Sequence, residues 1–296
     1  MNVLSLFDGI SCGQIAFERA GIKVDNYFAS EVDKNAIKVT QNNYHNTIQL
    51  GDVTKMEVSN LPGIDILIGG FPCQDLSIAS FGRKGLQGER SKLFWEFVRI
   101  LKSTKPKYFL LENVARMKKE DKEIITEIMG VEPIRINSEL VSEQLRDRLY
   151  WTNIPKVTQP NNKGKKLQDI LDCGYTDRVK SRCLAEIDSR PNSTPVKMFH
   201  RYYATGFTTL VFKDKKHYTD CKKHYDENFK GMKAVDIFTE SKIYEGVRYM
   251  TQRELERCQT VPSGYTSTVN RNGAASLLGN GWTVDVIAHI FKGLKQ

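Results

Sequence analysis

Cysteine, carboxylate and guanidinium side chains follow apolar segments at several places in this sequence, and these groups act as nucleophiles, proton donors and anion partners. Cys73 lies in Gly-Gly-Phe-Pro-Cys-Gln at residues 69–74, after the apolar run Ile64–Ile68. A cysteine thiolate is a strong nucleophile, although a free cysteine is usually a small buried apolar side chain. Because open α/β sheets place their sites beyond the carboxyl ends of strands, Cys73 is a candidate nucleophile.

A carboxylate and two arginines occur further along the chain. Glu112 follows the apolar run Tyr108–Leu111, where it is either an acid at a helix N-terminus or an acid of a site. Residues 144–148 read Gln-Leu-Arg-Asp-Arg. In a strand, alternation directs the glutamine and both arginines to one face, with the aspartate opposite. A solvated charged strand is the alternative.

The N-terminal segment has the pattern of a strand, a turn and a helix. Residues 6–13 read Leu-Phe-Asp-Gly-Ile-Ser-Cys-Gly, and glycines in such a turn let a ligand approach the backbone closely. Glu31 ends the next predicted strand, where a carboxylate can hold ribose hydroxyls, and Asp52 can accept a hydrogen bond from an adenine amino group. Because the turn lacks Gly-x-Gly-x-x-Gly, it favours a nucleoside without a phosphate; a purely structural turn is the alternative.

These segments need a scaffold that brings strand ends together, and residues 1–155 supply alternating strands and helices. Apolar periodicity predicts strand Asn2–Phe7, a helix to Ala20, strand Tyr27–Ser30, helix Val32–Asn43, strand Ile64–Ile68, a helix over Leu93–Leu101 and strand Tyr108–Leu111. This alternation with short connections is typical of an α/β fold with a doubly wound, mainly parallel sheet.

The regular pattern stops at about Lys156 and returns after Met250. Between them the sequence predicts short strands and loops without a helical period. A capping box at 251–254 starts a helix, and a last amphipathic helix is predicted over 283–294. We therefore divide the chain into one domain of residues 1–157 plus 251–296 and an inserted, irregular lobe of residues 158–250.

The chain has a net charge of +9, and the excess is concentrated in the lobe. Residues 156–250 hold 19 of the 44 Lys and Arg but 12 of the 35 Asp and Glu. A basic surface suits a polyanion such as nucleic acid, because each neutralised phosphate releases counterions. A solvated basic surface is the alternative.

Cysteine use and hydropathy indicate the compartment. The six cysteines include no Cys-x-x-Cys pair, which favours a reducing compartment over a disulfide framework. His217, Cys221 and His224 form a weak ligand pattern without a clear fourth ligand, so no metal is expected. No apolar run is long enough to span a bilayer, and the start lacks the basic leader of a signal peptide. These features predict a soluble, intracellular protein.

In combination, the segments resemble the cytosine carbon-5 DNA methyltransferase family. Pro-Cys-Gln at 72–74, Glu-Asn-Val at 112–114 and Gln-x-Arg-x-Arg at 144–148 occur in the family's order. Gln259–Tyr265 resembles its penultimate motif, and Gly-Asn-Gly-Trp-Thr-Val at 279–284 resembles its last. The resemblance covers nearly the whole chain except the basic lobe. The sequence after Cys73 is most similar to that of the catalytic domain of animal de novo methyltransferases. The small size of the chain is more similar to that of a bacterial or phage enzyme.

The resemblance implies a Rossmann-like, S-adenosylmethionine-dependent methyltransferase sheet with a small target-recognition lobe inserted before the C-terminal helices. It also implies double-stranded DNA as partner and the cytoplasm of a bacterium or phage host as location. The family positions that contact S-adenosylmethionine correspond here to Phe7, Asp8, Gly9, Ile10, Cys12, Gly13, Glu31, Val32, Asp52, Val53, Gly70, Pro72, Leu93, Asn280, Gly281 and Trp282.

The implied activity is that of a DNA (cytosine-5-)-methyltransferase. Cys73 would attack carbon 6 of a cytosine flipped out of the duplex, which makes carbon 5 nucleophilic toward the methyl group of S-adenosylmethionine. Glu112 would bind ring nitrogen 3 and the amino group of the base. Arg148 would bind the oxygen on carbon 2, and Arg146 would help to hold the site.

The sequence departs from the family at two positions, and two other functions fit the same motifs. Gly281 stands where the family usually has Ser, and Cys12 where it often has Gly or Thr. A tRNA cytosine-5 methyltransferase of the same fold is one alternative, but residues 257–260 lack the Cys-Phe-Thr segment of that enzyme. A non-catalytic DNA-binding regulator is the other; such relatives have lost Pro-Cys or Glu-Asn-Val residues, which are present here.

Overall fold

The computed structural model describes residues 1–73, 76, 85–88, 92–185, 194–233, 236–237 and 241–295. The chain forms two compact units. The first consists of residues 1–138, 147–161 and 281–296, and the second of residues 139–146 and 162–280. Residues 251–280 therefore group with the second unit, although the sequence assigns them to the cofactor-binding domain. The functional division at 158–250 stays a prediction.

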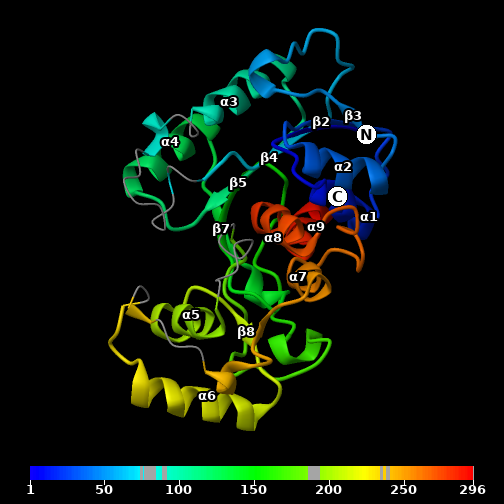
Figure 1. The fold of residues 1–296 in the computed structure, drawn as a ribbon. Coiled ribbons are helices and arrows are strands. Elements are labelled where there is room, and N and C mark those ends of the chain that lie inside the picture. Colours follow the sequence, from blue (N-terminus) through cyan, green and yellow to red (C-terminus); the bar gives the residue numbers. More distant parts are fainter. Residues whose placement is uncertain are drawn as a thin grey trace. The chain divides into compact units, whose positions relative to one another are not determined.

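A seven-stranded sheet with the order β3-β2-β1-β4-β5-β7-β6 forms the centre of the first unit (Figure 1). Its strands are β1 (Asn2–Leu6), β2 (Asn26–Ser30), β3 (Ile48–Gln49), β4 (Ile66–Gly69), β5 (Tyr108–Val114), β6 (Ile134–Asn137) and β7 (Asp147–Thr152). β1 to β5 pair in parallel, and β7 is antiparallel to both its neighbours. The predicted α/β class with a mainly parallel sheet is confirmed.

The central strands are apolar on both faces because helices cover both sides of the sheet. Leu4 and Leu67 pack with α3 (Leu93–Thr104) and α4 (Lys119–Met129) in one buried cluster. Ile68 faces the other way, toward α1 (Cys12–Ala20). In Figure 1, α3 and α4 lie on one side of the strands and α1 and α9 on the other.

The helices α1, α2 (Lys34–Asn43) and α9 (Val284–Phe291) complete the first unit. Phe17 of α1 and Phe291 of α9 stack with ring centroids 4.1 Å apart. This contact joins α9 to α1, although α9 begins 267 positions after Phe17 in the sequence. The helix that follows the predicted last motif therefore packs on the first helix of the chain.

The second unit has a core of its own, centred on Phe199. The ring of Phe199 packs against aromatic side chains from four other segments, namely Tyr202, Phe212, Tyr225 and Tyr244. Its elements are α5 (Pro195–His200), a π-helical turn (Arg201–Thr205), β8 (Leu210–Val211), α6 (Lys215–Asn228), β9 (Arg248–Tyr249), α7 (Gln252–Cys258) and α8 (Arg271–Asn280). Among the described residues, short 3-10 turns lie at Val53–Lys55, Gly85–Gln87, Ser138–Leu140, Leu167–Ile170, Lys242–Tyr244 and Lys292–Lys295.

Three expectations about local structure are corrected. A 14-residue helix, α6, lies in the segment that showed no helical period. Glu112 lies within β5 rather than beyond it, because the strand continues to Val114. The segment 144–148 is a strand from Asp147 onward, and Gln144 makes an isolated bridge to Ser181 instead. The predicted capping box is confirmed, with Thr251 and Glu254 bonded to each other's backbone N–H.

Within the described part of the chain, no helix has both the length and the hydropathy needed to cross a membrane.

Candidate active site

The first turn combines three backbone positions with positive φ. Phe7, Gly9 and Ser11 have φ angles of 55°, 59° and 55°. The N–H of Asp8 donates to Ser30 O at 3.2 Å, and this bond fixes the turn to the end of β2. The turn is therefore tightly held at the carboxyl edge of the sheet, where the sequence predicts a ligand.

The Asp8 side chain points into a network of hydroxyl groups. Tyr27 Oη donates to its carboxylate at 2.7 Å, and Ser11 Oγ donates to the other oxygen. Burial raises the pKa of the Asp8 carboxyl to about 6, although the hydrogen bonds from Ser11, Ser5 and Tyr27 act in the opposite direction. These contacts hold the turn, a task that the sequence did not indicate for Asp8.

Two acids stand at the ends of the neighbouring strands. Glu31, at the end of β2, accepts hydrogen bonds from the N–H groups of Gly9, Val32 and Asp33 at 2.7–2.8 Å. Asp52 caps the turn after β3, and its Oδ1 accepts from Thr54 N and Oγ1 at 2.9 and 2.8 Å. Both carboxylates are fixed by backbone N–H groups at the edge of the sheet where the sequence predicts a nucleoside site.

The ends of β4, β5 and β7 bring together a second group of predicted site residues. Arg148 Nε lies 2.8 Å from Glu112 Oε1, and both side chains are nearly buried. Trp282 Nε1 donates to Glu112 Oε2 at 3.1 Å. A Cβ atom at Gly70 would lie 2.7 Å from Glu112 Oε2 and 3.0 Å from Trp282 Nε1, so glycine is needed there. Glu112 is thus held on both oxygens, beside the strand end that leads to Cys73.

Cys73 is partly buried and packs against the apolar cluster under α3. Asn113 Nδ2 donates to Phe71 O at 3.0 Å, which ties the chain before Cys73 to the strand that carries Glu112. The sequence also predicts a mobile, basic lid over Cys73 in the segment Asp75–Lys92, which holds Arg83, Lys84 and Arg90. Most of this segment falls outside the described residues. Among its described residues, Leu86 donates its N–H to Asp121 Oδ1 of α4 at 3.0 Å.

Arg146 belongs to the second unit and is buried there. Its Nη1 donates to Gly279 O at 3.1 Å and to Leu184 O at 3.3 Å. Arg148 belongs to the first unit. The two arginines, which the sequence predicts on one face of a strand, therefore lie in different units. These contacts support the backbone at Leu184 and at Gly279, the first residue of the last motif.

The other predicted cofactor positions fall into two groups. Some are buried: Ile10, Cys12, Gly13, Val53 and Gly281. Others are partly or fully exposed: Phe7, Val32, Pro72, Leu93 and Asn280. Val32 is 68% exposed, which leaves its side chain available to a ligand at the end of β2.

Sequence reasoning missed the residues that hold the site residues in place. Tyr27, Ser11 and Asn113 do so through side-chain hydrogen bonds. Each lies in or beside a predicted motif, and a polar side chain on a buried strand is the signal that could have drawn attention to Tyr27. The bond between Trp282 and Glu112 has no local signal, because it joins residues 170 positions apart.

The histidines of the weak metal pattern have other partners. His217 Nε2 lies 2.8 Å from Ile243 O, and His224 Nδ1 lies 3.1 Å from Tyr244 Oη. Over the residues that the structure describes, no three His, Cys, Asp or Glu side chains are grouped in a way that could hold a metal ion.

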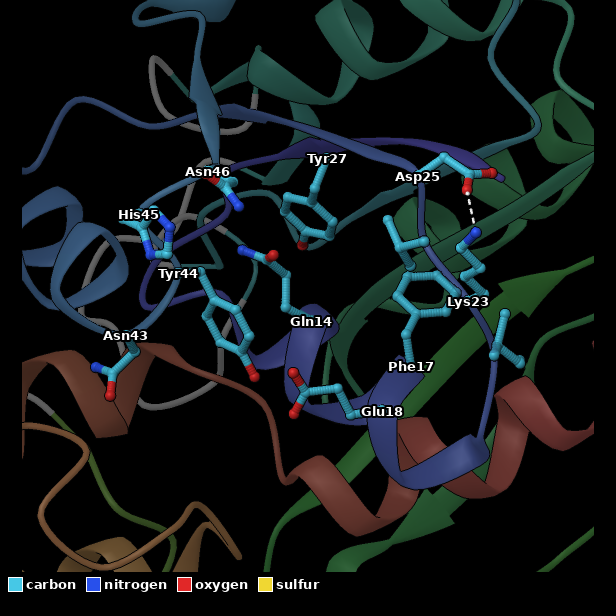
Figure 2. A pocket seen from close by; sticks show the side chains of 12 residues that line it. Gln14, Phe17, Glu18, Lys23, Asp25, Tyr27, Asn43, Tyr44, His45 and Asn46 are labelled. Carbon is cyan, nitrogen blue, oxygen red and sulfur yellow. Dashed lines mark ion pairs between the residues drawn. The ribbon is translucent and has the colours of Figure 1, made fainter.

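A pocket of about 420 Å³ lies on the first unit (Figure 2). Side chains of α1, such as Gln14 and Glu18, face Tyr27 and the segment that follows α2. None of the predicted site residues lines it. Tyr27 is its link to the site, since the same hydroxyl bonds Asp8.

The fold and the two clusters define a Rossmann-like methyltransferase, and comparison with known proteins gives the family. The model of the C-5 cytosine-specific DNA methylase family matches residues 1–132 and 140–296. The chain belongs to this family.

Known relatives come from phages and bacteria. The chain is 33% identical to the orphan methyltransferase M.SPRI of Bacillus phage SPR over 77% of its own length and 53% of that protein. It is 28% identical to the type II methyltransferase M.NlaX of Neisseria lactamica, over 99% and 96%. The chain thus spans about half of the first relative and nearly all of the second.

Among solved structures, the methyltransferase EhMeth of Entamoeba histolytica has the same fold. It superposes with a TM-score of 0.70 and 17% identity, over 100% of this chain and 99% of EhMeth. At this identity the likeness supports the fold, and the Rossmann-like methyltransferase architecture is confirmed.

Proposed function

We propose that this chain is a DNA (cytosine-5-)-methyltransferase, which moves a methyl group from S-adenosylmethionine to carbon 5 of cytosine in double-stranded DNA. The observation that carries the proposal is the Glu112 carboxylate, held by Arg148 at 2.8 Å and by Trp282 at 3.1 Å beside the strand end that leads to Cys73. An acid, a guanidinium and a thiol at one sheet edge are the groups that this reaction needs on a pyrimidine ring.

Cys73 supplies the nucleophile. Carbon 5 of cytosine is too weakly nucleophilic to take a methyl group directly. When the Cys73 thiolate adds to carbon 6, the π electrons of the 5,6 double bond shift toward carbon 5 and the conjugated ring nitrogen 3. Carbon 5 thereby becomes nucleophilic. After carbon 5 is methylated, loss of its proton restores the double bond and expels the thiolate. Cys73 is only partly buried, which leaves its sulfur accessible to a base.

Glu112 and Arg148 recognise the base and stabilise the charge that the thiolate introduces. A carboxyl group of Glu112 can bond ring nitrogen 3 and the amino group, and it shares a proton with nitrogen 3 as negative charge develops there. Arg148 can bond the oxygen on carbon 2. Arg146 holds the carbonyl groups of Leu184 and Gly279 within the second unit, which gives it a supporting role in this proposal.

The residues at the ends of β1, β2 and β3 fit S-adenosylmethionine, which supplies an electrophilic methyl group when bound. Glu31 and Asp52 are acceptors for hydroxyl and amino groups, and a pair of carboxylates disfavours a phosphate. The N–H of Gly9 is used by Glu31, so the turn does not form a phosphate cradle. The donors and acceptors therefore match a cationic nucleoside.

The basic segment 156–250 provides the contacts to DNA in this proposal. A base inside a duplex is inaccessible to Cys73, so the cytosine must rotate out of the stack, which costs a few kcal/mol. Contacts between Lys or Arg side chains and phosphates offset part of that cost. A protein that acts on chromosomal or phage DNA in this way works in the bacterial cytoplasm.

The test is a covalent trap. Bisulfite sequencing of DNA from cells that express the protein identifies the methylated site. An oligonucleotide duplex with 5-fluorocytosine at that site should then form a band on a denaturing gel that depends on S-adenosylmethionine, because fluorine cannot leave as a proton does. Cys73→Ala should give no band and should lower methyl transfer at least a thousandfold, with cofactor affinity unchanged by calorimetry.

Two results would contradict this assignment. Methyl transfer by Cys73→Ala within tenfold of the wild type would remove Cys73 as the nucleophile. Methylation of tRNA, with duplex DNA left unmodified in the same assay, would assign the chain to RNA.

A further inference from the structure

Trp282 contacts the proposed acid of the site. Its indole Nε1 donates to Glu112 Oε2 at 3.1 Å, while Arg148 Nε lies 2.8 Å from Glu112 Oε1. The two carboxylate oxygens thus have different partners from different segments. The contact of Trp282 is a hydrogen bond, whereas that of Arg148 is an ion pair without hydrogen-bond geometry. The directional bond from Trp282 therefore restricts rotation of the carboxylate about its terminal bond.

The indole and the carboxylate are pressed against the backbone of Gly70. An added Cβ at this glycine would lie within 3.0 Å of both Trp282 Nε1 and Glu112 Oε2. Gly70 is the residue after β4, three positions before Cys73. The orientation of Glu112 is therefore set in register with the strand end that carries the nucleophile.

Trp282 is itself held by a buried neighbour. Thr283, 1% exposed, is the N-cap residue of α9, and its Oγ1 accepts from Ser138 Oγ at 2.9 Å. The helix that follows is anchored to α1 through the stacked rings of Phe17 and Phe291. An indole attached to such a rigid start of a helix has little freedom to leave its partner.

We propose that Trp282 is a positioning residue for Glu112, and this inference rests on the proposed function. In that function Arg148 must also bond the oxygen on carbon 2 of cytosine, so its ion pair with Glu112 is shared once the base arrives. The Trp282 N–H has no such second task at the base. It keeps Glu112 Oε2 occupied, so that Oε1 faces ring nitrogen 3 in the required orientation.

The first experiment observes the contact directly and needs no activity. The chain contains three tryptophans, Trp95, Trp151 and Trp282, so a spectrum of the protein with 15N-labelled indoles has three signals. The Trp→Phe variants assign them. Glu112→Gln should move the Trp282 signal, because a neutral amide replaces the charged acceptor, and leave the Trp151 signal, whose donor bonds Thr126 Oγ1 at 2.9 Å. An unmoved Trp282 signal would overturn the proposal.

The second experiment separates positioning from cofactor contact. Benzothienylalanine has the shape of tryptophan with sulfur in place of N–H, and it can be introduced at residue 282 alone. We expect kcat to fall about tenfold to a hundredfold, the range for a lost hydrogen bond to a charged group. Adduct formation with 5-fluorocytosine should slow by the same factor, while KM for S-adenosylmethionine stays within twofold.

The same replacement at Trp95, which is 46% exposed on α3, is the matched control and should leave kcat unchanged. An unchanged kcat for the variant at 282, or a loss confined to KM for the cofactor, would overturn the positioning role. If the wild-type protein methylates no cytosine, the proposed function fails, and the indole spectrum still decides whether Trp282 binds Glu112.

Discussion

Two carboxylates of this protein, Asp8 and Glu112, are held in opposite kinds of surroundings. Asp8 receives hydrogen bonds from the neutral hydroxyls of Tyr27 and Ser11. Glu112 is paired with the guanidinium of Arg148. A buried carboxylate without a cation is costly to ionise, which explains the pKa of about 6 for Asp8. At the residue scale, Asp8 therefore holds the turn at a cost in stability, whereas Glu112 has a cationic partner, as its proposed role in the reaction requires.

Asp8→Asn tests this cost. The pKa of Asp8 in the folded protein, about 6, lies above its ordinary value of 3.8. The folded state thus binds the proton more tightly than the unfolded chain, and stability falls as pH rises from about 4 to about 6. An amide at this position has no charge to bury. The free energy of unfolding of the variant, relative to the wild type, should rise by about 2 kcal/mol across that window.

Urea unfolding at pH values between 4.5 and 7.5 measures this difference. Glu57→Gln is the control, because Glu57 is an exposed carboxylate of the same unit, and it should follow the wild-type curve. Parallel curves for Asp8→Asn and the wild type would show that Asp8 is ionised at no cost in the folded protein.

At the element scale, the packing of α1 on the sheet depends on one small residue. A Cβ at Gly13 would lie 2.7 Å from Tyr27 Oη and 2.8 Å from Ile68 Cδ1. The Tyr27 hydroxyl has little room to move because it bonds Asp8. Gly13, the second residue of α1, thus permits the close approach of this helix to the sheet, and so fixes the position of the turn that precedes the helix.

Gly13→Ala should lower the free energy of unfolding by about 1–3 kcal/mol, the usual cost of overpacking a core. The displaced Tyr27 would also disturb Asp8, so affinity for S-adenosylmethionine should fall. Gly63→Ala is the matched control, since its added Cβ meets nothing within 4 Å. Denaturant unfolding and calorimetry compare the two variants, and equal stability would mean that α1 shifts without strain.

The elements that the sequence predicted well are those with a local signal. β1 and α3 bury continuous or periodic apolar residues, and their bounds agree within a few residues with Asn2–Leu6 and Leu93–Thr104. The helix α6 was missed because its buried residues are Cys221 and Tyr225, too few for a visible stripe. Its signals were the Asp214 N-cap and Lys–Asp pairs at i,i+4 spacing.

The sequence predicted which residues belong to the candidate site better than it predicted the contacts between them. Cys73, Glu112 and Arg148 follow from motifs, and the pairing of β5 with β7 brings the last two together. The separation of Arg146 from Arg148 was not foreseen, because strand alternation assumes a strand that begins before Asp147. Long-range bonds such as that of Trp282 depend on the return of α9 to the sheet, which no local pattern specifies.

At the scale of the whole molecule, composition and fold divide the chain in the same general way. The second unit has its own aromatic core around Phe199, and most of the excess positive charge lies in residues 156–250 within or next to it. The motifs with Cys73 and Glu112 lie in the first unit. We infer that chemistry and sequence recognition are assigned to different parts of the chain.

Exchange of residues 158–250 for the corresponding segment of a family member with another target site tests this division. Base-edge contacts from the segment would set which cytosine reaches Cys73, because direct readout specifies sequence while phosphate contacts set position. The chimera should methylate the donor's site, as read by bisulfite sequencing. It should also form the 5-fluorocytosine adduct on an oligonucleotide with that site, and Cys73→Ala in the chimera should abolish it.

A second chimera that exchanges residues 162–280 is the matched control for the borders, because these residues belong to one compact unit and keep their shared core. Both chimeras should change target together if 158–250 holds the readout. Substitution of exposed lysines of α6, such as Lys215 and Lys223, should weaken DNA binding on all sequences alike and flatten its salt dependence. An active chimera of residues 158–250 that still methylates the original site would place sequence readout in the segment Asp75–Lys92, next to Cys73.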